Sequence, residues 1–318
     1  MKKFALLALA AALFCTLALD AGEARWPRRS VEVVVTASAG GDTDFNARTL
    51  GKYFKDVAGA PLVVTNMPGG GGSTATGNVK NARPDGNKAL FCHTGQLIVN
   101  EVSGLIDYDF TAFEVCCVAG LNTSYVFVAS KDSGITSLAD LVAKAKAEPG
   151  KVIYGTEMGG FTHLQGLRLA KESGIDLKMV DTGSTSEKVT SLLAGRIDFA
   201  AVSYGSVQDY QKTGDLIILA QGGSERNPLL GDIPTIKEEG VDFSMEFPYV
   251  VSFPKGTNPE IVAKMAGFVK TITEKPEYAK DLEDGYKQIV HYKNTEDAIK
   301  YLTEIREDFM RYKDVLKK

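Results

Sequence analysis

Several polar segments of this chain contain glycine and have the residue types that could hold a small anion. The clearest is Ser38-Ala39-Gly40-Gly41-Asp42-Thr43-Asp44, which lies between an apolar run at residues 31–35 and a helical pattern. Two glycines permit positive φ and close backbone approach, and the first amides of a helix have no partner within the helix. The turn is therefore a candidate anion site, although any turn from a strand to a helix can have this composition.

Similar segments recur where later strands are predicted to end. They are His93-Thr94-Gly95-Gln96, Gly155-Thr156-Glu157-Met158-Gly159-Gly160-Phe161-Thr162, Asp181-Thr182-Gly183-Ser184 and Ser203-Tyr204-Gly205-Ser206. In α/β proteins, ligand sites gather beyond the carboxyl ends of parallel strands. The repeated pattern thus favours a binding site at the strand ends.

Enzymatic interpretations have weaker support in the sequence. The glycine loop Gly69–Gly72 follows a predicted strand, but it lacks the Gly-Lys-Ser/Thr ending of a phosphate loop. Glu157 and His163 could form an acid–base pair; alternatively, Glu157 is a loop residue and His163 packs or caps at a helix start. The histidines are far apart and have no local thiol or carboxylate partner, so we expect neither a metal site nor a cofactor.

Alternating strand and helix patterns must position these turns. Predicted strands, among them residues 62–65, 89–92, 151–154 and 197–202, alternate with helices, which indicates an α/β fold with mainly parallel sheets. The last part is helical by pattern, at residues 259–273, 276–285 and from 294 onward. A length of 318 residues allows two domains, and a net charge of −4 argues against a nucleic-acid partner.

The first residues have the pattern of a secretory signal. Lys2 and Lys3 precede the apolar run Phe4–Leu19, with small residues at possible cleavage points after Ala21 or Ala24. A membrane anchor is the alternative, but the run is shorter than the roughly 20 residues of a span. Cys15 follows the bulky Phe14, which favours a soluble exported protein over a lipid-anchored one.

Three cysteines remain after residue 24, namely Cys92, Cys116 and Cys117. An odd number in an oxidising compartment leaves one cysteine over, and all three lie in apolar, strand-like stretches. We expect small buried hydrophobic residues rather than a disulfide.

A series of short motifs extends from residue 26 to the C-terminus. They include Trp26-Pro27, Ala39-Gly40-Gly41-Asp42-Thr43-Asp44, Asn66-Met67-Pro68-Gly69-Gly70, Arg83-Pro84-Asp85-Gly86, Leu193-Ala194-Gly195-Arg196-Ile197-Asp198, Asp232-Ile233-Pro234-Thr235 and Pro254-Lys255-Gly256-Thr257. In order and spacing the chain resembles the extracytoplasmic solute receptors of tripartite tricarboxylate transporters, also called Bug receptors.

The resemblance implies a two-lobed periplasmic-binding-protein fold of type II. Each lobe would be a mainly parallel sheet flanked by helices, with two hinge crossings near residues 122–127 and 247–251. Residues 1–24 would be the signal peptide, residues 25–124 plus 247–318 lobe one, and residues 125–246 lobe two. The implied protein is a periplasmic monomer without direct membrane insertion.

In such receptors, the ligand is usually a small carboxylate held by backbone amides and polar loops. Carried over to this chain, the first-lobe contacts would be Ser38, Ala39, Gly40, Gly41, Thr43, Thr94, Gly95 and Gln96. Those of the second lobe would be Thr156, Phe161, Thr162, Thr182, Gly183, Ser184 and Ser203. Asp44 would hold the binding loop by accepting backbone hydrogen bonds rather than contacting ligand.

Three positions depart from the family pattern. Thr36-Ala37-Ser38 replaces a proline and an aromatic residue, Asp42 stands where a small residue is usual, and Val202 falls where many members have an aspartate. Asp42 either turns to solvent or marks a ligand less anionic than usual. The implied function is delivery of a di- or tricarboxylate to membrane permease subunits. Alternatives are a receptor that reports to a sensor kinase, and an enzyme on the same fold.

Overall fold

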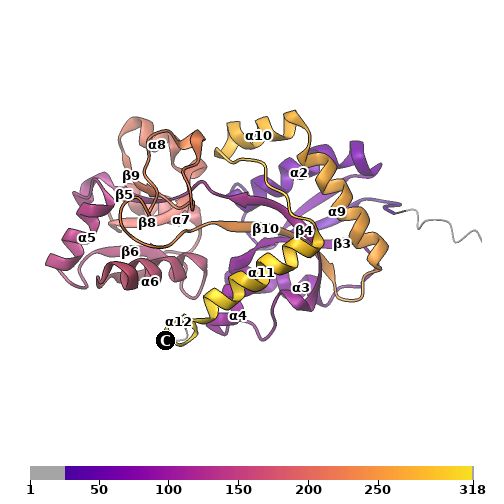
Figure 1. Cartoon of the computed structure of the whole chain (residues 1–318), viewed down its shortest axis with the longest axis horizontal. Coiled ribbons are helices and arrows are strands. Elements are labelled where there is room, and N and C mark those ends of the chain that lie inside the picture. Colours follow the sequence, from indigo (N-terminus) through magenta and orange to yellow (C-terminus); the bar gives the residue numbers. More distant parts are fainter. Residues whose placement is uncertain (1–25, 317–318) are drawn as a thin grey trace, which may run out of the picture.

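The computed structural model describes residues 26–316, so the predicted signal peptide, its cleavage sites and Cys15 lie outside the described residues. The described chain forms two five-stranded sheets in separate lobes (Figure 1). Their strand orders are β2-β1-β3-β10-β4 and β7-β6-β8-β5-β9. No helix within residues 26–316 is long and apolar enough to cross a bilayer.

The first sheet combines early strands with one late strand. Its elements are β1 (Val31–Val35), α2 (Asp42–Ala58), β2 (Leu62–Asn66), η1 (Gly70–Gly72), α3 (Ser73–Lys80), β3 (Lys88–His93), η2 (Gly95–Val99), α4 (Asn100–Ser103), η3 (Phe110–Ala112), β4 (Phe113–Asn122) and β10 (Phe247–Pro254). Strands β1, β2 and β3 are parallel, whereas β10 is antiparallel to both β3 and β4. The carboxyl ends of β1, β2 and β3 therefore lie at one edge.

The second sheet has the same plan. Its elements are β5 (Tyr125–Ser130), η4 (Lys131–Ser133), α5 (Leu138–Ala147), β6 (Ile153–Thr156), α6 (Phe161–Ser173), β7 (Lys178–Asp181), α7 (Thr185–Leu193), β8 (Phe199–Ser203), η5 (Tyr204–Ser206), α8 (Gln208–Thr213), β9 (Leu216–Gln221) and η6 (Pro228–Leu230). Strand β5 is antiparallel to β8 and β9, and the other pairings are parallel.

The chain changes sheets twice along these strands. It leaves the first sheet at Asn122, the end of β4, and enters the second at Tyr125, the start of β5. It returns to the first sheet at Phe247, the start of β10. Both junctions coincide with the hinge regions predicted from the sequence, while the lobe boundaries stay a prediction.

The central strands of each sheet are buried on both faces, as their apolar sequences require, whereas the edge strands β2 and β7 are partly exposed. In β1, Val31, Val33, Val34 and Val35 are at most 1% exposed because α2 and α3 cover the sheet. The three cysteines are free and fully buried in β3 and β4, as predicted. Burial raises the pKa of each thiol, which keeps it in the unreactive protonated form.

Four helices follow β10, namely α9 (Pro259–Thr273), α10 (Pro276–Tyr286), α11 (Thr295–Met310) and α12 (Lys313–Leu316). Helix α11 begins after the N-cap Asn294 and packs on β4. Its apolar side chains are only partly buried, since Ile299 is 43% exposed while Leu302 is fully covered. Helix α12 contacts both α4 and α6, so this helix touches both lobes (Figure 1).

One glycine in α6 is required by packing rather than by backbone conformation. A Cβ at Gly166 would lie 2.4 Å from Cε1 of Tyr154, whose side chain is fully buried and cannot move aside. We expect Gly166→Ala to lower the free energy of unfolding by about 1–3 kcal/mol, measured by denaturant unfolding. The matched control is Gly267→Ala in α9, where a Cβ meets nothing within 4 Å; equal stability of the two variants would contradict the prediction.

Candidate ligand-binding site

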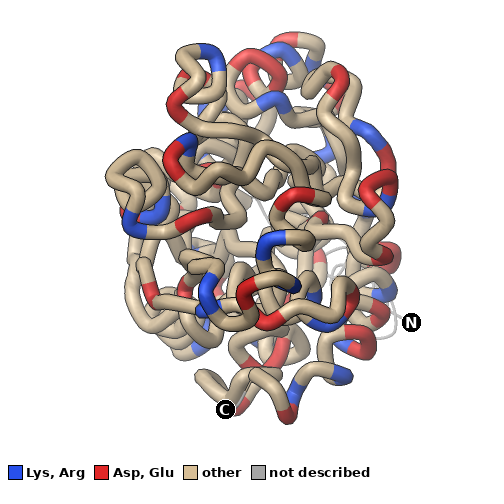
Figure 2. The backbone as a smooth tube through the Cα atoms, turned by 90° about the vertical axis from the view of Figure 1, so that its left-hand side faces the viewer, with Lys and Arg blue, Asp and Glu red and all other residues tan. Residues whose placement is uncertain are grey.

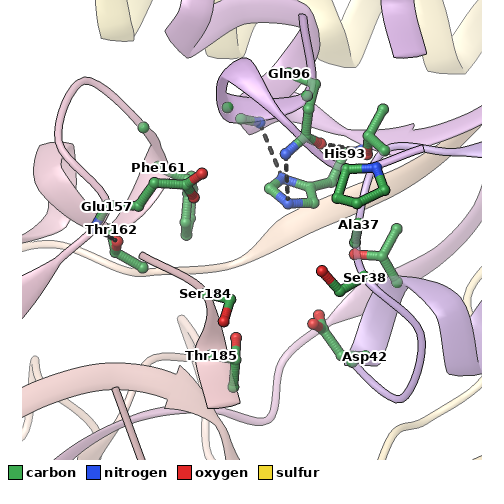
Figure 3. Close-up of a pocket in the computed structure, with 18 of the residues that line it drawn as sticks. Ala37, Ser38, Asp42, His93, Gln96, Glu157, Phe161, Thr162, Ser184 and Thr185 are labelled. Atoms are coloured by element: carbon green, nitrogen blue, oxygen red, sulfur yellow. Dashed lines mark hydrogen bonds between the residues drawn. The ribbon is translucent and has the colours of Figure 1, made fainter. Parts of the chain in front are cut away.

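A pocket of about 270 Å³ lies between the lobes, at the carboxyl ends of the parallel strands (Figure 3). The first lobe contributes the turn at Ser38, the glycine loop at Gly69 and the segment from His93 to Gln96. The second lobe contributes the loop before α6 and the first turn of α7. Figure 3 shows Ser38 and Asp42 facing Ser184 and Thr185 across the pocket. Four of the five polar segments noted in the sequence thus contribute to one site, whereas no residue of Ser203-Tyr204-Gly205-Ser206 lines it.

The amino-terminal ends of α2, α6 and α7 all line this pocket. Their first residues, Asp42, Phe161 and Thr185, are pocket residues, as are the preceding N-cap residues Gly41, Gly160 and Ser184. Helix amino termini carry free amides and partial positive charge, which favour an anion. The first turn of α6 has no acidic residue and its N-cap is a glycine, so its amides remain available to a ligand.

The carboxylate of Asp44 connects the first-lobe turn to neighbouring side chains by hydrogen bonds. Its carboxylate accepts hydrogen bonds from the Gly40 amide at 2.9 Å, from Asn66 Nδ2 at 2.8 Å and from Arg48 Nε at 2.9 Å. Burial opposes the charge, but these donors outweigh it and hold the pKa of Asp44 below its usual value. Asp44 does not line the pocket, and its loop-holding role stays a prediction.

We expect Asp44→Ala to lower the free energy of unfolding by about 1–3 kcal/mol, because the Gly40 amide and Asn66 lose a charged acceptor. Chemical denaturation measures this change. The control is Asp56→Ala, which removes an exposed carboxylate from the same helix. A loss no larger than that of the control would show that Asp44 does not hold the turn.

Lys188 is a buried cation in the pocket wall, and its position in α7 was not predicted from the sequence. It is 2% exposed, and its ammonium donates to Thr162 Oγ1 at 3.1 Å. Among residues 26–316, no carboxylate lies within salt-bridge distance of it. Burial lowers the pKa of Lys188 to about 8, although the carboxylates of Glu157 and Asp42 oppose this. An ammonium has three donors, so two of them point to no acceptor in the described chain.

Aromatic rings form the apolar part of the pocket. Phe247 lies 4.9 Å from Phe161 and 5.2 Å from Tyr125 between ring centroids, and the His93 ring lies 4.5 Å from Phe247. His93 accepts a hydrogen bond from the Gly95 amide at its Nδ1, and burial lowers its pKa to about 3. His93 is therefore neutral at physiological pH and adds no positive charge to the site.

Glu157 and His163 do not form a hydrogen-bonded acid–base pair. The Nδ1 atom of His163 accepts the Gly159 amide at 3.1 Å, so the histidine closes the loop at the start of α6. Glu157 lines the pocket, and burial raises the pKa of its carboxyl group. Within residues 26–316, no group of three metal-ligating side chains is close enough together to bind a metal ion.

Many of the predicted contact residues line the pocket: Ser38, Ala39, Gly41, Thr43, Gly95, Gln96, Phe161, Thr162 and Ser184. Others do not line the pocket and bond to other parts of the protein. Thr156 Oγ1 bonds Thr162 Oγ1 at 2.9 Å, and Thr182 Oγ1 donates to the Thr156 carbonyl. Gly183 donates its amide to Asp181, and Gly40 receives a hydrogen bond on its carbonyl from Tyr286.

Two further predicted contacts are fully enclosed by protein. Thr94 is 0% exposed, and Ser203 is 1% exposed and accepts from Asn122 Nδ2 at 3.1 Å. Conversely, several lining residues were not predicted as contacts: Thr36, Ala37, Asp42, Pro68, Gly69, Gly71, Gly72, His93, Asn100, Tyr125, Glu157, Gly160, Thr185, Ser186, Lys188 and Phe247. The sequence indicates the glycine loop as a possible nucleotide motif and as part of the family pattern but not as a ligand contact, although its place after β2 puts it at the ligand edge.

Comparison with known proteins places this chain among transport receptors. The profile described as the tripartite tricarboxylate transporter family receptor matches residues 46–318. A Cupriavidus necator protein of the UPF0065 group, from the gbd 5′ region, is 29% identical over 265 residues, covering 81% of this chain and 79% of the relative.

Solved structures show the same fold. Rpa4515 of Rhodopseudomonas palustris, solved with adipate, has a TM-score of 0.84 at 23% identity, over 92% of this chain and 98% of its own. The periplasmic binding protein BugD has a TM-score of 0.80 at 24% identity, again over 92% and 98%. The two-lobed α/β fold predicted from the sequence is confirmed.

Proposed function

The chain belongs to the tripartite tricarboxylate transporter receptor family, and on this premise we propose that it captures a small carboxylate between its lobes and delivers it to a membrane permease. The family is one of receptors rather than enzymes. We propose a periplasmic monomer whose lobes are residues 25–124 plus 247–318 and residues 125–246. The ligand contacts would be the predicted residues that line the pocket, together with Lys188.

The buried ammonium of Lys188 is the observation that carries this proposal. A charge in a protein interior is costly unless it is paired, yet within residues 26–316 the one hydrogen-bond partner of Lys188 is the neutral hydroxyl of Thr162. A ligand carboxylate in the pocket would supply the missing acceptor and the opposite charge. The free amides at the start of α6 and the hydroxyl groups of Ser184 and Thr185 are available to the same carboxylate.

A few such contacts supply enough binding free energy for the micromolar affinity of a receptor. Charge-assisted hydrogen bonds contribute roughly 1.5–3 kcal/mol each, and micromolar affinity corresponds to about 8 kcal/mol. The pocket offers one cation, helix amides from both lobes and several hydroxyl groups. Because both lobes supply contacts, binding would favour the closed arrangement of the lobes. The adipate in the related R. palustris structure supports a carboxylate of this size class.

Titration calorimetry on purified protein, unfolded and refolded to remove bound ligand, tests the proposal. The panel is succinate, malate, adipate, citrate and benzoate, and we expect at least one to bind with micromolar affinity. Acetamide and the matching amides, which have the same shape without the charge, are the controls. Absence of binding across the acids, or equal binding of acids and amides, would contradict a carboxylate receptor. Mass spectrometry of the ligand released on unfolding would identify the natural compound.

A further inference from the structure

The pocket also contains a carboxylate that a purely anionic ligand would not need. Asp42 is the first residue of α2 and lines the pocket beside Ser38 (Figure 3). Its Oδ2 accepts from Tyr249 OH at 2.6 Å and from Asn122 Nδ2 at 3.1 Å. Both donors lie on strands of the first sheet next to the hinge, β10 and β4, so the carboxylate is fixed in place.

Among the described residues, no cation forms an ion pair with Asp42, although Lys188 and Asp42 interact electrostatically at longer range. Within residues 26–316, no lysine, arginine or histidine nitrogen lies within 4 Å of its carboxylate, and both side-chain donors reach the same oxygen, Oδ2. The other oxygen, Oδ1, therefore receives no side-chain donor. Burial raises the pKa of Asp42 despite these hydrogen bonds.

The charges of the pocket are divided between the lobes. Lys188 lies in the second lobe with the free amides of α6, and Asp42 lies in the first lobe. Glu157 is a second carboxylate, but it lies in the same lobe as Lys188, and the Lys188 charge acts to lower its pKa. A dicarboxylate in this pocket would place negative charge near Asp42, whereas a ligand with both signs of charge would match both lobes.

We infer that the preferred ligand is a carboxylic acid that also carries a protonated amine, with its carboxylate at Lys188 and its ammonium at Asp42. This inference rests on the proposed function and specifies the ligand class of the same site. The ammonium would donate to Asp42 Oδ1 and would supply the countercharge that the protein does not provide. Many members of the family have an aspartate at the position of Val202, which is fully buried in this chain. The acid that would meet the ammonium here, Asp42, is therefore at a different position.

Matched ligand pairs test the inference, because each pair differs only by an ammonium in place of a hydrogen. The pairs are succinate with aspartate, glutarate with glutamate, and propionate with alanine, measured by titration calorimetry at pH 7. In any pair that binds, we expect the amino member to bind about 10- to 100-fold more tightly, the range of one charge-assisted hydrogen bond. Tighter binding of the simple acids would overturn the inference and leave the carboxylate receptor intact.

Variants of the pocket carboxylates test whether Asp42 is responsible for the preference for the amino member of each pair. Asp42→Asn keeps an acceptor for Tyr249 and is expected to abolish the preference for the amino member, partly by tightening the binding of the simple acid. Asp56→Asn, which neutralises an exposed carboxylate of α2 outside the pocket, is the control and should keep the preference. Glu157→Gln changes the other pocket carboxylate, and loss of the preference in this variant instead would overturn the assignment to Asp42. If Asp42→Asn does not fold, the wild-type ranking still decides the ligand class. Binding of no acid at all, in the pairs or the wider panel, would contradict the proposed function itself.

Discussion

Replacing Lys188 by methionine is expected to weaken the binding of the best carboxylate about 10- to 150-fold, the equivalent of one charge-assisted hydrogen bond of roughly 1.5–3 kcal/mol. Methionine has a similar length and is apolar, so it fits the buried site without a cavity. Titration calorimetry of wild type and variant with the same ligand measures the loss.

The stability of the ligand-free variant separates a binding role from a structural one. Removing a buried ammonium whose partner is the neutral Thr162 hydroxyl should leave the protein as stable as the wild type or more so. The matched control is Lys171→Met, which removes an exposed lysine of α6 outside the pocket. A Lys188→Met protein with unchanged affinity, or with affinity and stability lost together, would contradict the role of Lys188 as the carboxylate partner.

Local sequence signals were sufficient for most of the elements. Helix α5 (Leu138–Ala147) begins after the cap Ser137 and ends shortly before Pro149. Helix α9 likewise begins after the cap Asn258 with a proline in its first turn. These signals act within a few residues, so the sequence alone contains the physical cause of each boundary.

The charged residues of the pocket could not be found in this way. Lys188 follows the capping residues of α7 and looks like an ordinary exposed lysine; its burial results from packing against Thr162, 26 residues earlier. Asp42 is fixed by Tyr249, which is 207 residues distant in the chain. Such contacts depend on the strand order and on the lobe arrangement, and no local pattern encodes them.

Some residues predicted to contact the ligand do not line the pocket, and this too depends on the strand order. Thr182 and Gly183 follow β7, the edge strand of the second sheet, and the chain reaches the pocket only at Ser184. Ser203 ends β8 beside the hinge, where Asn122 covers it. A sequence motif identifies the correct loop, but the residue of that loop that faces the ligand depends on where the strand lies in the sheet.

Carboxylate affinity is expected to fall as the pH rises above about 8, because Lys188 loses its proton near this pH in the ligand-free protein. Burial lowers the pKa of Lys188, while the carboxylates of Glu157, Asp42, Asp181 and Glu187 act to raise it. A bound carboxylate favours the charged amine, so binding takes up a proton above this pKa. The affinity should be nearly constant below pH 7 and should fall by up to tenfold for each pH unit above 8. Calorimetry from pH 6 to 10 measures this profile, and Lys188→Met should remove the dependence.

The stability of the ligand-free protein should change in the opposite direction. An unfolded lysine has a pKa of 10.5, so between pH 8 and 10.5 the unfolded chain binds a proton at Lys188 that the folded protein has released. Rising pH therefore favours the folded state in this window, by up to about 3 kcal/mol in all. Other groups titrate there too, so the quantity to measure is the difference in unfolding free energy between wild type and Lys188→Met. Ligand binding and unfolding both favour the protonated form of Lys188. If the affinity falls with pH while the difference in unfolding free energy between wild type and Lys188→Met stays constant, a group other than Lys188 controls binding.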